Sequence, residues 1–254
     1  MKKLLIPRFS QFSPQLAFAL TFSLINLWGN SICGIVLAVT VENSLTIVQN
    51  QPELGINFRL PPRGAPGPRD TAGSRDPSNH IVALIPGTNF GFTTQEYPSL
   101  WVFFPYTTIQ EVKFTLKDAE DRQIYQQEFS LPGTPGFVEI KLPKTIAPLE
   151  IDQVYFWNLE VGLKPYGNLD NPIIRGGIER VVMDNDLQSQ LAGKSEQEKL
   201  GIYAQNGLWF DVVSGLITLR QSNPHDEEVY GWWVSLLQQI GLKELNNQSL
   251  VKLP

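Results

Sequence analysis

The sequence predicts a mainly β protein, an antiparallel β-sandwich of the immunoglobulin or fibronectin type III kind followed by a C-terminal helical cap. Short apolar or alternating segments recur between residues 79 and 183, and Pro and Gly separate them. After Asp184 the spacing of apolar residues changes to that of helices. The chain of 254 residues, 42% of them hydrophobic, is long enough to bury a full core.

The first 38 residues have the features of a signal peptide. Basic residues come first, an apolar run covers residues 16–28, and the small-residue motif ending at Ala38 is an acceptable cleavage site. We therefore expect an exported protein, periplasmic or extracellular. An uncleaved membrane anchor is the alternative, because residues 16–39 have the length of a membrane span. Membrane contact is expected only through this N-terminal segment.

Charge and cysteine content argue against several classes of protein. The formal net charge is −5, and it becomes −8 without residues 1–38, which carry three basic residues and no acid. Nucleic-acid binding favours a basic surface, so we expect no nucleic-acid partner. The only cysteine, Cys33, lies in the signal segment. The mature chain is therefore expected to contain no disulfide bond.

Residues 39–78 form an extended segment rich in Pro, Gly and Arg. Residues 58–78 have the period of neither a strand nor a helix. The segment carries four arginines, Arg59, Arg63, Arg69 and Arg75. Guanidinium groups suit bidentate contact with carboxylates or phosphates of a partner, although Asp70 and Asp76 offset part of the charge. A flexible tether is the alternative interpretation of this composition.

Residues 79–183 hold the predicted strands of the sandwich. Two short apolar runs that end before prolines, Ile81–Ile85 and Ser99–Phe104, are predicted to be buried strands. Strict alternation predicts a hairpin over residues 111–129, with its turn at 118–122. Further strands are predicted at residues 138–142, 155–161 and near 178–183.

Residues 184–254 are predicted to form a helical cap that packs on the sandwich. Ser195 and Glu198 have the spacing of a capping box, and Gly207 ends that helix. A second apolar helix follows from Trp209. Asn223 is predicted to be the N-cap of a third helix, which Gly241 ends. The spacing imitates one tetratricopeptide repeat, but without a second copy we interpret the helices as a cap.

The residues needed for common kinds of catalysis are scarce. Outside the signal segment the chain has His80 and His225 but no Cys, so we expect no metal and no cofactor. No G-x-S-x-G elbow or phosphate-binding loop is present. We therefore expect a protein that is not an enzyme. A pair of carboxylates of the glycosidase kind stays open, because twenty-five acidic residues allow it.

Aromatic residues offer a second interpretation, an exposed platform for carbohydrate. The candidates are Tyr97, Trp101, Phe103 and Phe104. The run SLWVFF is apolar on both faces, which favours burial of these rings instead.

Several blocks of the chain together resemble a known family. The blocks are FRLPPRGAPGPRDTAGSR, ALIPGTNFGFTTQEYPSLWVFFP, LEIDQVYFWNLEV, GGIERV, YAQNGLWFDVVSGLITLRQSNP and WVSLLQQIGL. In order and spacing, over about residues 57–242, they are similar to the cyanobacterial domain-of-unknown-function family 928. The resemblance implies an exported cyanobacterial protein of no established activity. It also implies that residues 63–68 pack back on the body or meet a partner.

The chain differs from this family at two cysteines. Relatives carry one Cys shortly before the ALIP strand and one after the Tyr-x-Trp strand, where this chain has residues 78–80 and 162–163. If relatives join these cysteines, the resemblance implies that this chain lacks the bridge and depends on packing alone. Loss of such a bridge typically costs about 2–5 kcal/mol.

These observations lead to one main hypothesis and two alternatives. The main hypothesis is a non-enzymatic protein-interaction module of the cell envelope, whose partner is an unknown envelope protein rather than a polysaccharide. Its partner surface is predicted to include Arg63, Arg69, Glu179 and Arg180. The first alternative is a protein that binds, or acts on, carbohydrate or cell wall, and the second is a structural accessory of an envelope system.

Overall fold

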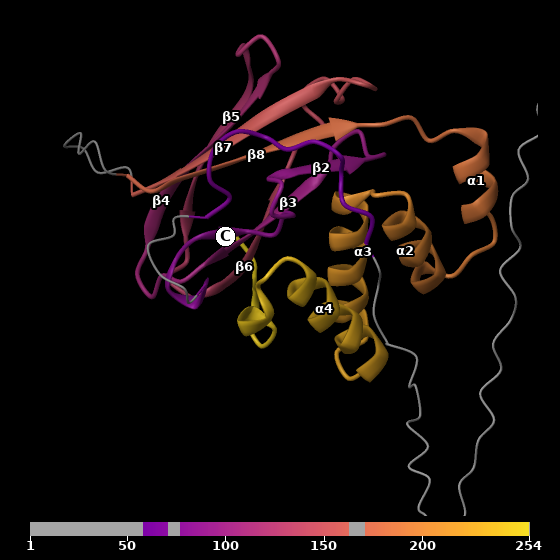
Figure 1. The fold of residues 1–254 in the computed structure, drawn as a ribbon. Coiled ribbons are helices and arrows are strands. Elements are labelled where there is room, and N and C mark those ends of the chain that lie inside the picture. The colour runs from indigo at the N-terminus through magenta and orange to yellow at the C-terminus, as the bar shows by residue number, and fades with distance from the viewer. Residues whose placement is uncertain (1–57, 71–76, 163–170, 254) are drawn as a thin grey trace, which may run out of the picture. The chain divides into compact units, whose positions relative to one another are not determined.

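Two mixed β-sheets and four α-helices make up the described part of the chain, residues 58–70, 77–162 and 171–253 of the computed structural model (Figure 1). The predicted signal peptide lies outside the described residues, as do residues 39–57 and 71–76 of the extended segment. The helices lie together beside the sheets. The prediction of a mainly β protein with C-terminal helices is confirmed.

The first sheet has the strand order β1-β3-β6-β9. Its strands are β1 (Val82–Ala83), β3 (Ser99–Phe104), β6 (Gly136–Lys141) and β9 (Leu250–Val251). The β3 strand runs antiparallel to both β1 and β6, whereas β9 runs parallel to β6. The last residues of the chain therefore return from the helices to extend this sheet at its edge.

The second sheet has the strand order β2-β8-β7-β4-β5. Its strands are β2 (Phe90–Thr93), β4 (Gln110–Asp118), β5 (Gln123–Leu131), β7 (Val154–Val161) and β8 (Ile173–Arg180). The predicted hairpin is confirmed as β4 and β5, which pair antiparallel. Strand β2 pairs with β8 in parallel.

The prediction of a purely antiparallel sandwich is wrong at two places. Parallel neighbours need a long crossover between them. The chain supplies one through β3 to β7, between β2 and β8, and another through β7, β8 and the helices, between β6 and β9. The β2 and β9 strands were not predicted, because neither the FGFT nor the LV segment shows a strand pattern. Strand β8 also begins five residues before the predicted position.

Alternation decides which residues form the core between the sheets. In β7, Tyr155, Trp157, Leu159 and Val161 are buried, and the residues between them are only partly buried. All six residues of β3 are buried, in one core cluster that also includes residues of the second sheet and of the helices. Phe137 of β6 contacts the rings of both Phe103 and Trp233, so the helices cover the other face of this sheet.

The helices begin and end at identifiable capping residues. They are α1 (Asn185–Leu191), α2 (Glu196–Gln205), α3 (Trp209–Ser222) and α4 (Glu227–Gln239), and short 3-10 helices cover Pro77–Asn79 and Lys243–Leu245. The capping box of Ser195 and Glu198 is confirmed. Gly207 and Gly241 follow the ends of α2 and α4 with φ of +73° and +72°, which glycine adopts without strain. Within the described residues, no helix is both long and apolar enough to span a membrane.

The predicted N-cap of α4 is wrong by three residues. Asp226 is the N-cap, and its carboxylate accepts hydrogen bonds from the backbone of Glu228 and Val229. Asn223 instead ends α3, and its carbonyl accepts from the Asp226 N–H in the turn between the helices. Asp and Asn are both good N-cap residues, so the sequence alone did not choose between them.

A pair of adjacent glycines allows close packing on both faces of β8. A Cβ atom on Gly176 would overlap the Trp157 ring on the inner face of the sheet. A Cβ atom on Gly177 would lie 2.9 Å from the Cβ atom of Ala65, and it would also strike the Phe90 ring. The GG of the GGIERV block therefore has a packing role on each face of the strand.

We predict that Gly176→Ala and Gly177→Ala each destabilise the fold by about 1–3 kcal/mol, the usual cost of overpacking. Urea unfolding followed by tryptophan fluorescence measures this cost. Gly201→Ala in α2 is the matched control, because nothing lies within 4 Å of its added Cβ atom. Alanine there should stabilise the protein by about 0.5–1 kcal/mol. Equal stability of all three variants would contradict the packing role of the pair.

Candidate functional site

The described part of the Arg-Pro segment, residues 58–70, packs on the folded body. The Arg59 N–H donates to the Ala204 carbonyl, and the Ala65 N–H donates to the Thr88 carbonyl. The Pro68 carbonyl in turn accepts from the Arg175 N–H of β8. The described residues of this segment therefore pack on the folded body. Arg75 lies outside the described residues.

Arg63 and Glu179 are two predicted partner-binding residues that the structure brings together. Their side chains form an ion pair, with Arg63 Nη2 2.9 Å from Glu179 Oε2. The Arg63 guanidinium also lies over the rings of Phe90 and Phe92 in β2. Its side chain remains 51% exposed, whereas that of Glu179 is only 8% exposed. Burial raises the pKa of Glu179, as does Asp152, while Arg63 acts in the opposite direction.

Arg69 and Arg180 are engaged inside the fold. Arg69 donates from Nη1 to the Ile85 carbonyl at 3.0 Å and from Nη2 to the Ile240 carbonyl at 2.9 Å. Arg180 donates from Nη1 to the Leu149 carbonyl at 2.7 Å and pairs with the carboxylate of Glu96. These contacts give both arginines a structural role, so they offer a partner less than the sequence suggested.

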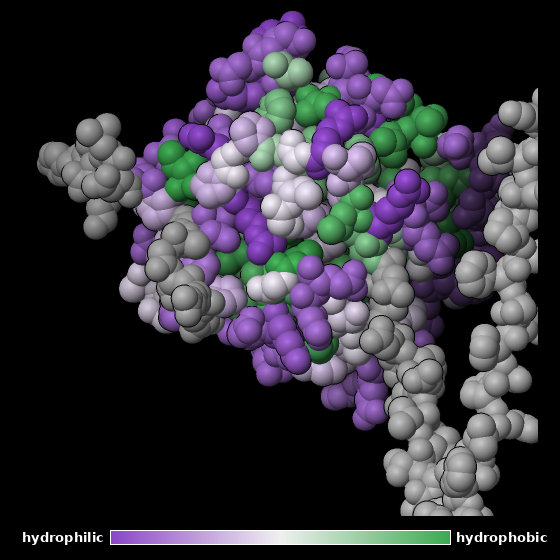
Figure 2. Space-filling model, in the orientation of Figure 1, coloured by the Kyte–Doolittle hydropathy of each residue, from purple (hydrophilic) through white to green (hydrophobic). Residues whose placement is uncertain are grey.

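The aromatic candidates for a carbohydrate platform are buried or nearly so. Phe103 and Phe104 are each 1% exposed, and Trp101 is 7% exposed. Tyr97 is partly buried and donates its hydroxyl to the Ile146 carbonyl. On the face shown in Figure 2, hydrophobic residues form separate groups among polar ones. A flat aromatic platform made of these four rings is therefore absent from the described structure.

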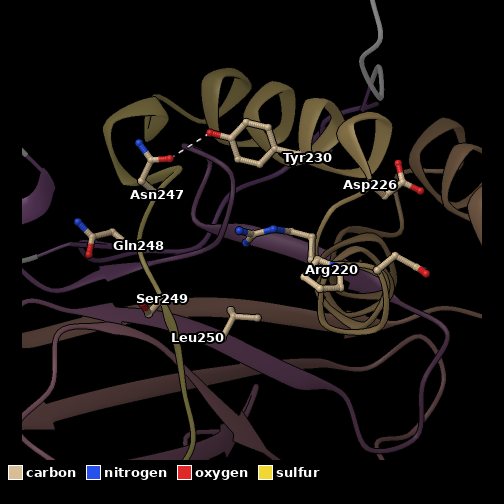
Figure 3. Close-up of a pocket in the computed structure, with 9 residues that line it drawn as sticks. Arg220, Asp226, Tyr230, Asn247, Gln248, Ser249 and Leu250 are labelled. Carbon is tan, nitrogen blue, oxygen red and sulfur yellow. Dashed lines mark hydrogen bonds between the residues drawn. The ribbon is translucent and has the colours of Figure 1, made fainter.

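A cavity of about 440 Å³ lies where the C-terminal end of α3, the start of α4 and the segment before β9 meet (Figure 3). Polar side chains make up most of its lining. The lining residues are Arg220, Asn223, Pro224, Asp226, Tyr230, Asn247, Gln248, Ser249 and Leu250. The volume falls in the range of about 300–1,000 Å³ that is typical of small-molecule sites.

Arg220 is the principal charged group of this cavity. Its guanidinium carbon lies 4.4 Å from the centre of the Trp233 ring, a cation–π contact that sets its position. Trp233 itself is fixed by donation from Nε1 to the Asn246 carbonyl. The Nη1 atom of Arg220 is buried and has no hydrogen-bond acceptor among the described residues. Burial lowers the pKa of Arg220, and Tyr230 opposes this shift.

The other polar groups of the cavity are arranged around this cation. The Tyr230 hydroxyl donates to Asn247 Oδ1 at 3.1 Å, which orders the side facing α4 (Figure 3). The Asp226 carboxylate caps α4 and is not within 4.0 Å of the Arg220 nitrogens. The cavity thus combines several amide and hydroxyl groups with one cation that has no anionic partner in the described part of the chain. Such a site suits a ligand that carries a negative charge on a polar body.

Sequence reasoning missed this cavity. The apolar spacing from Trp209 predicts a packing helix and assigns no role to Arg220. One signal was available, because Arg220 is the only basic residue of a helix that is otherwise mostly apolar. The sequence could not show that residues 247–250 return to the end of that helix.

Other groups with possible chemistry are satisfied within the fold. Asp211 is buried in α3, and its carboxylate accepts from the N–H and the hydroxyl of Thr94 at 3.1 and 2.7 Å. Burial raises its pKa, and the hydrogen bonds from Thr94 oppose that shift. In the turn at 118–122, Asp118 accepts from the backbone of Glu120 and from Arg122. Over the described ranges, no cluster of three His, Cys, Asp or Glu side chains could hold a metal ion.

Comparison with known proteins identifies one family. The family model described as Domain of Unknown Function (DUF928) matches residues 64–250. The match covers all four helices and both sheets except Val251 of β9, and it includes the residues of the Arg220 cavity. No curated protein matches the chain.

We predict that Arg69→Ala destabilises the protein more than Arg63→Ala does. Arg69 supplies charged hydrogen bonds to two carbonyls, and each such bond is worth about 1.5–3 kcal/mol. Arg63 is half exposed, and its removal should cost about 1 kcal/mol or less. Urea unfolding of both variants at neutral pH tests the order. The reverse order would show that Arg69 is not a structural residue.

Glu179 should make stability fall as pH rises. Its pKa is raised in the folded state, so the unfolded chain releases this proton at a lower pH than the folded protein does. Stability therefore falls from about pH 4.3 upward until the pH exceeds the pKa of the folded state. Glu179→Gln should therefore be more stable than the wild type at pH 7, and the difference should vanish near pH 4.

Glu198→Gln provides a control of opposite sign. Hydrogen bonding to the Ser195 backbone and to Lys194 lowers the pKa of Glu198 to about 2. Its contribution is present above the unfolded pKa and is lost as pH falls towards 2. This variant should be less stable than the wild type at pH 7. Thermal unfolding from pH 3 to 8 compares the two, and parallel curves for both variants would contradict the assignments.

Proposed function

The chain belongs to the DUF928 family, and we propose that it is a non-enzymatic binding module of the cell envelope whose site is the Arg220 cavity. The ligand is an anionic group on a polar body. One observation carries this proposal: Arg220 is held in a cavity of about 440 Å³ without an anionic partner among the described residues.

The energetics of a half-buried cation support binding of an anion. A guanidinium that is taken from water without a hydrogen-bond partner is destabilising until an acceptor reaches it. Carboxylate and phosphate oxygens match its planar set of donors and can bind in a bidentate manner. The cation–π contact with Trp233 holds the group in place before the ligand arrives, which lowers the entropic cost of binding.

The lining favours binding over acid–base catalysis. Asp226 is the only carboxylate among the lining residues, and the helix N-terminus already uses it. General acid–base hydrolysis needs two acids across a bound substrate, or an acid with a raised pKa beside the reacting bond. The cavity residues supply amides, hydroxyls and one cation, which are binding groups.

The proposal also includes export of the protein and a relationship of its two sheets to immunoglobulin or fibronectin type III sandwiches. The N-terminal basic and apolar pattern supports export to the periplasm or beyond, in a cyanobacterial cell, or an anchor in the membrane. An immunoglobulin or fibronectin type III relationship is supported by Tyr155, whose hydroxyl accepts from the Glu150 N–H a few residues upstream. Such sandwiches carry a similar tyrosine corner.

A partner protein at the Arg63 and Glu179 surface is the second candidate. The observation in its favour is that Arg63 is half exposed, next to the aromatic rings of β2. Arginine beside aromatic side chains is common at protein interfaces. The Arg220 cavity is favoured because its cation has no anionic partner within the described ranges, whereas Arg63 already has one.

We predict that small anions bind in a manner that depends on Arg220. Isothermal titration with galacturonate and with inorganic phosphate should show saturable binding to the wild type. Arg220→Gln should weaken it by about tenfold or more, as expected for loss of one charged hydrogen-bonding group. Arg220→Lys keeps the charge but loses the bidentate geometry, so its affinity should lie between the two.

Arg122→Gln is the matched control, because this exposed arginine lies in the hairpin turn and does not line the cavity. Circular dichroism checks that each variant is folded. Binding that survives Arg220→Gln, or that is absent from the wild type for both anions, overturns the proposed site. If Arg63→Ala abolishes capture of an envelope protein while Arg220→Gln does not, the second candidate is correct.

A further inference from the structure

We infer that the Arg220 cavity is one end of a longer groove that binds a chain of acidic sugar residues. The inference rests on the proposed function and adds the class and the length of the ligand. It comes from a second cavity, of about 370 Å³, that lies next to the first along the same C-terminal segment. Its lining residues are Trp101, Glu139, Gln221, Leu250, Val251, Lys252 and Leu253.

The two cavities share walls. Leu250 lines both of them, with residues 247–249 lining the first and residues 251–253 the second. On the opposite side, the neighbouring residues Arg220 and Gln221 at the end of α3 each line one cavity. The cavities therefore follow each other along the gap between the end of α3 and the last residues of the chain.

Strand register shows where the second cavity lies on the sheet. Leu250 pairs with Phe137, whose ring contacts Trp233 of α4, so this face of β6 and β9 looks towards the helices. Glu139 and Trp101 are register partners on the same face by alternation, since Phe103 pairs with Phe137. The groove thus runs from the junction of α3 and α4 across the edge of the first sheet.

The second cavity also supplies groups suited to a charged, polar ligand. Lys252 is exposed and forms no ion pair with another described residue. The Glu139 carboxylate accepts from the neutral Ser99 hydroxyl and keeps its negative charge, so this cavity holds one anion as well as the Lys252 cation. Trp101 also lines this cavity, and its Nε1 is buried and has no acceptor among the described residues. With Arg220 in the first cavity, the groove presents a cation in each half.

The polar lining favours a saccharide over a peptide. The amides of Asn223, Asn247, Gln248 and Gln221, with the hydroxyl of Ser249, each donate and accept hydrogen bonds. Sugar hydroxyls do the same at closely spaced positions. An extended peptide needs sockets for its apolar side chains or a strand edge to pair with. In the first cavity the apolar lining is limited to Pro224 and Leu250, and the saccharide assignment rests on this cavity. The second cavity is lined by Trp101, Leu250, Val251 and Leu253 at the β9 edge of the first sheet, so the peptide arm of the titration below tests the assignment there.

Two adjacent subsites make affinity depend on chain length. Once one sugar residue is bound at Arg220, the next is delivered to the second cavity at a high effective concentration. A chain that spans both subsites should therefore bind much more tightly than a monomer. A carboxylate on each sugar residue would place negative charge near both Arg220 and Lys252.

Isothermal titration with galacturonate oligomers of increasing length tests the inference. The tetramer should bind the wild-type protein at least about tenfold more tightly than the monomer. The methyl-esterified tetramer keeps the length but loses the charge, and it should bind weakly. Lys252→Gln should weaken tetramer binding and leave monomer binding unchanged, whereas Arg220→Gln should weaken both.

Lys243→Gln is the matched control, because Lys243 is exposed and lines neither cavity. Equal affinity for monomer and tetramer, or tetramer binding that is insensitive to Lys252→Gln, overturns the longer groove. If the longer groove is overturned in this way, loss of monomer binding in Arg220→Gln would still support the proposed function. Tighter binding of an acidic peptide than of the tetramer would overturn the saccharide assignment.

Discussion

The fold depends on the hydrogen bonds that two buried backbone carbonyl groups accept just after β1. Leu84 and Ile85 lie beyond the short strand and are almost fully buried, so their carbonyls need partners inside the protein. The Trp209 indole, at the start of α3, donates to the Leu84 carbonyl at 2.8 Å. Arg69 donates to the Ile85 carbonyl and also to Ile240 at the end of α4. The Arg-Pro segment, the first sheet and the helices therefore meet at one point.

The position of the candidate site follows from this junction. Trp209 holds the N-terminal end of α3 against β1 and β2, so the opposite end of this 14-residue helix projects towards β9. There Arg220 lies over Trp233 of α4, while Phe137 of β6 packs on the same ring. The cavity is thus built from a helix end, a helix start and a terminal segment, each placed by packing elsewhere.

Arginine has two different roles in this protein, and partner geometry separates them. Arg63, Arg69 and Arg180 each find carboxylates or carbonyls that belong to the body. Among the described residues, Arg220 contacts the aromatic face of Trp233, which attracts the cation but accepts no conventional hydrogen bond, and its Nη1 has no acceptor. A satisfied arginine stabilises the fold, whereas an arginine that retains free donors next to a cavity can stabilise a complex. Composition alone does not separate these roles, because it counts all four alike.

The sequence by itself determined the local structure: the β3 strand, the β4–β5 hairpin, the alternating buried residues of β7 and the capping box of α2. These features depend on residues that are close along the chain. Only the tertiary structure decided the parallel pairing of β2 and β9, the pairing of Arg63 with Glu179, and the Arg220 cavity. Each of these joins residues that are far apart in sequence. Their contacts arise from the packing of whole elements, which periodicity and capping signals do not encode.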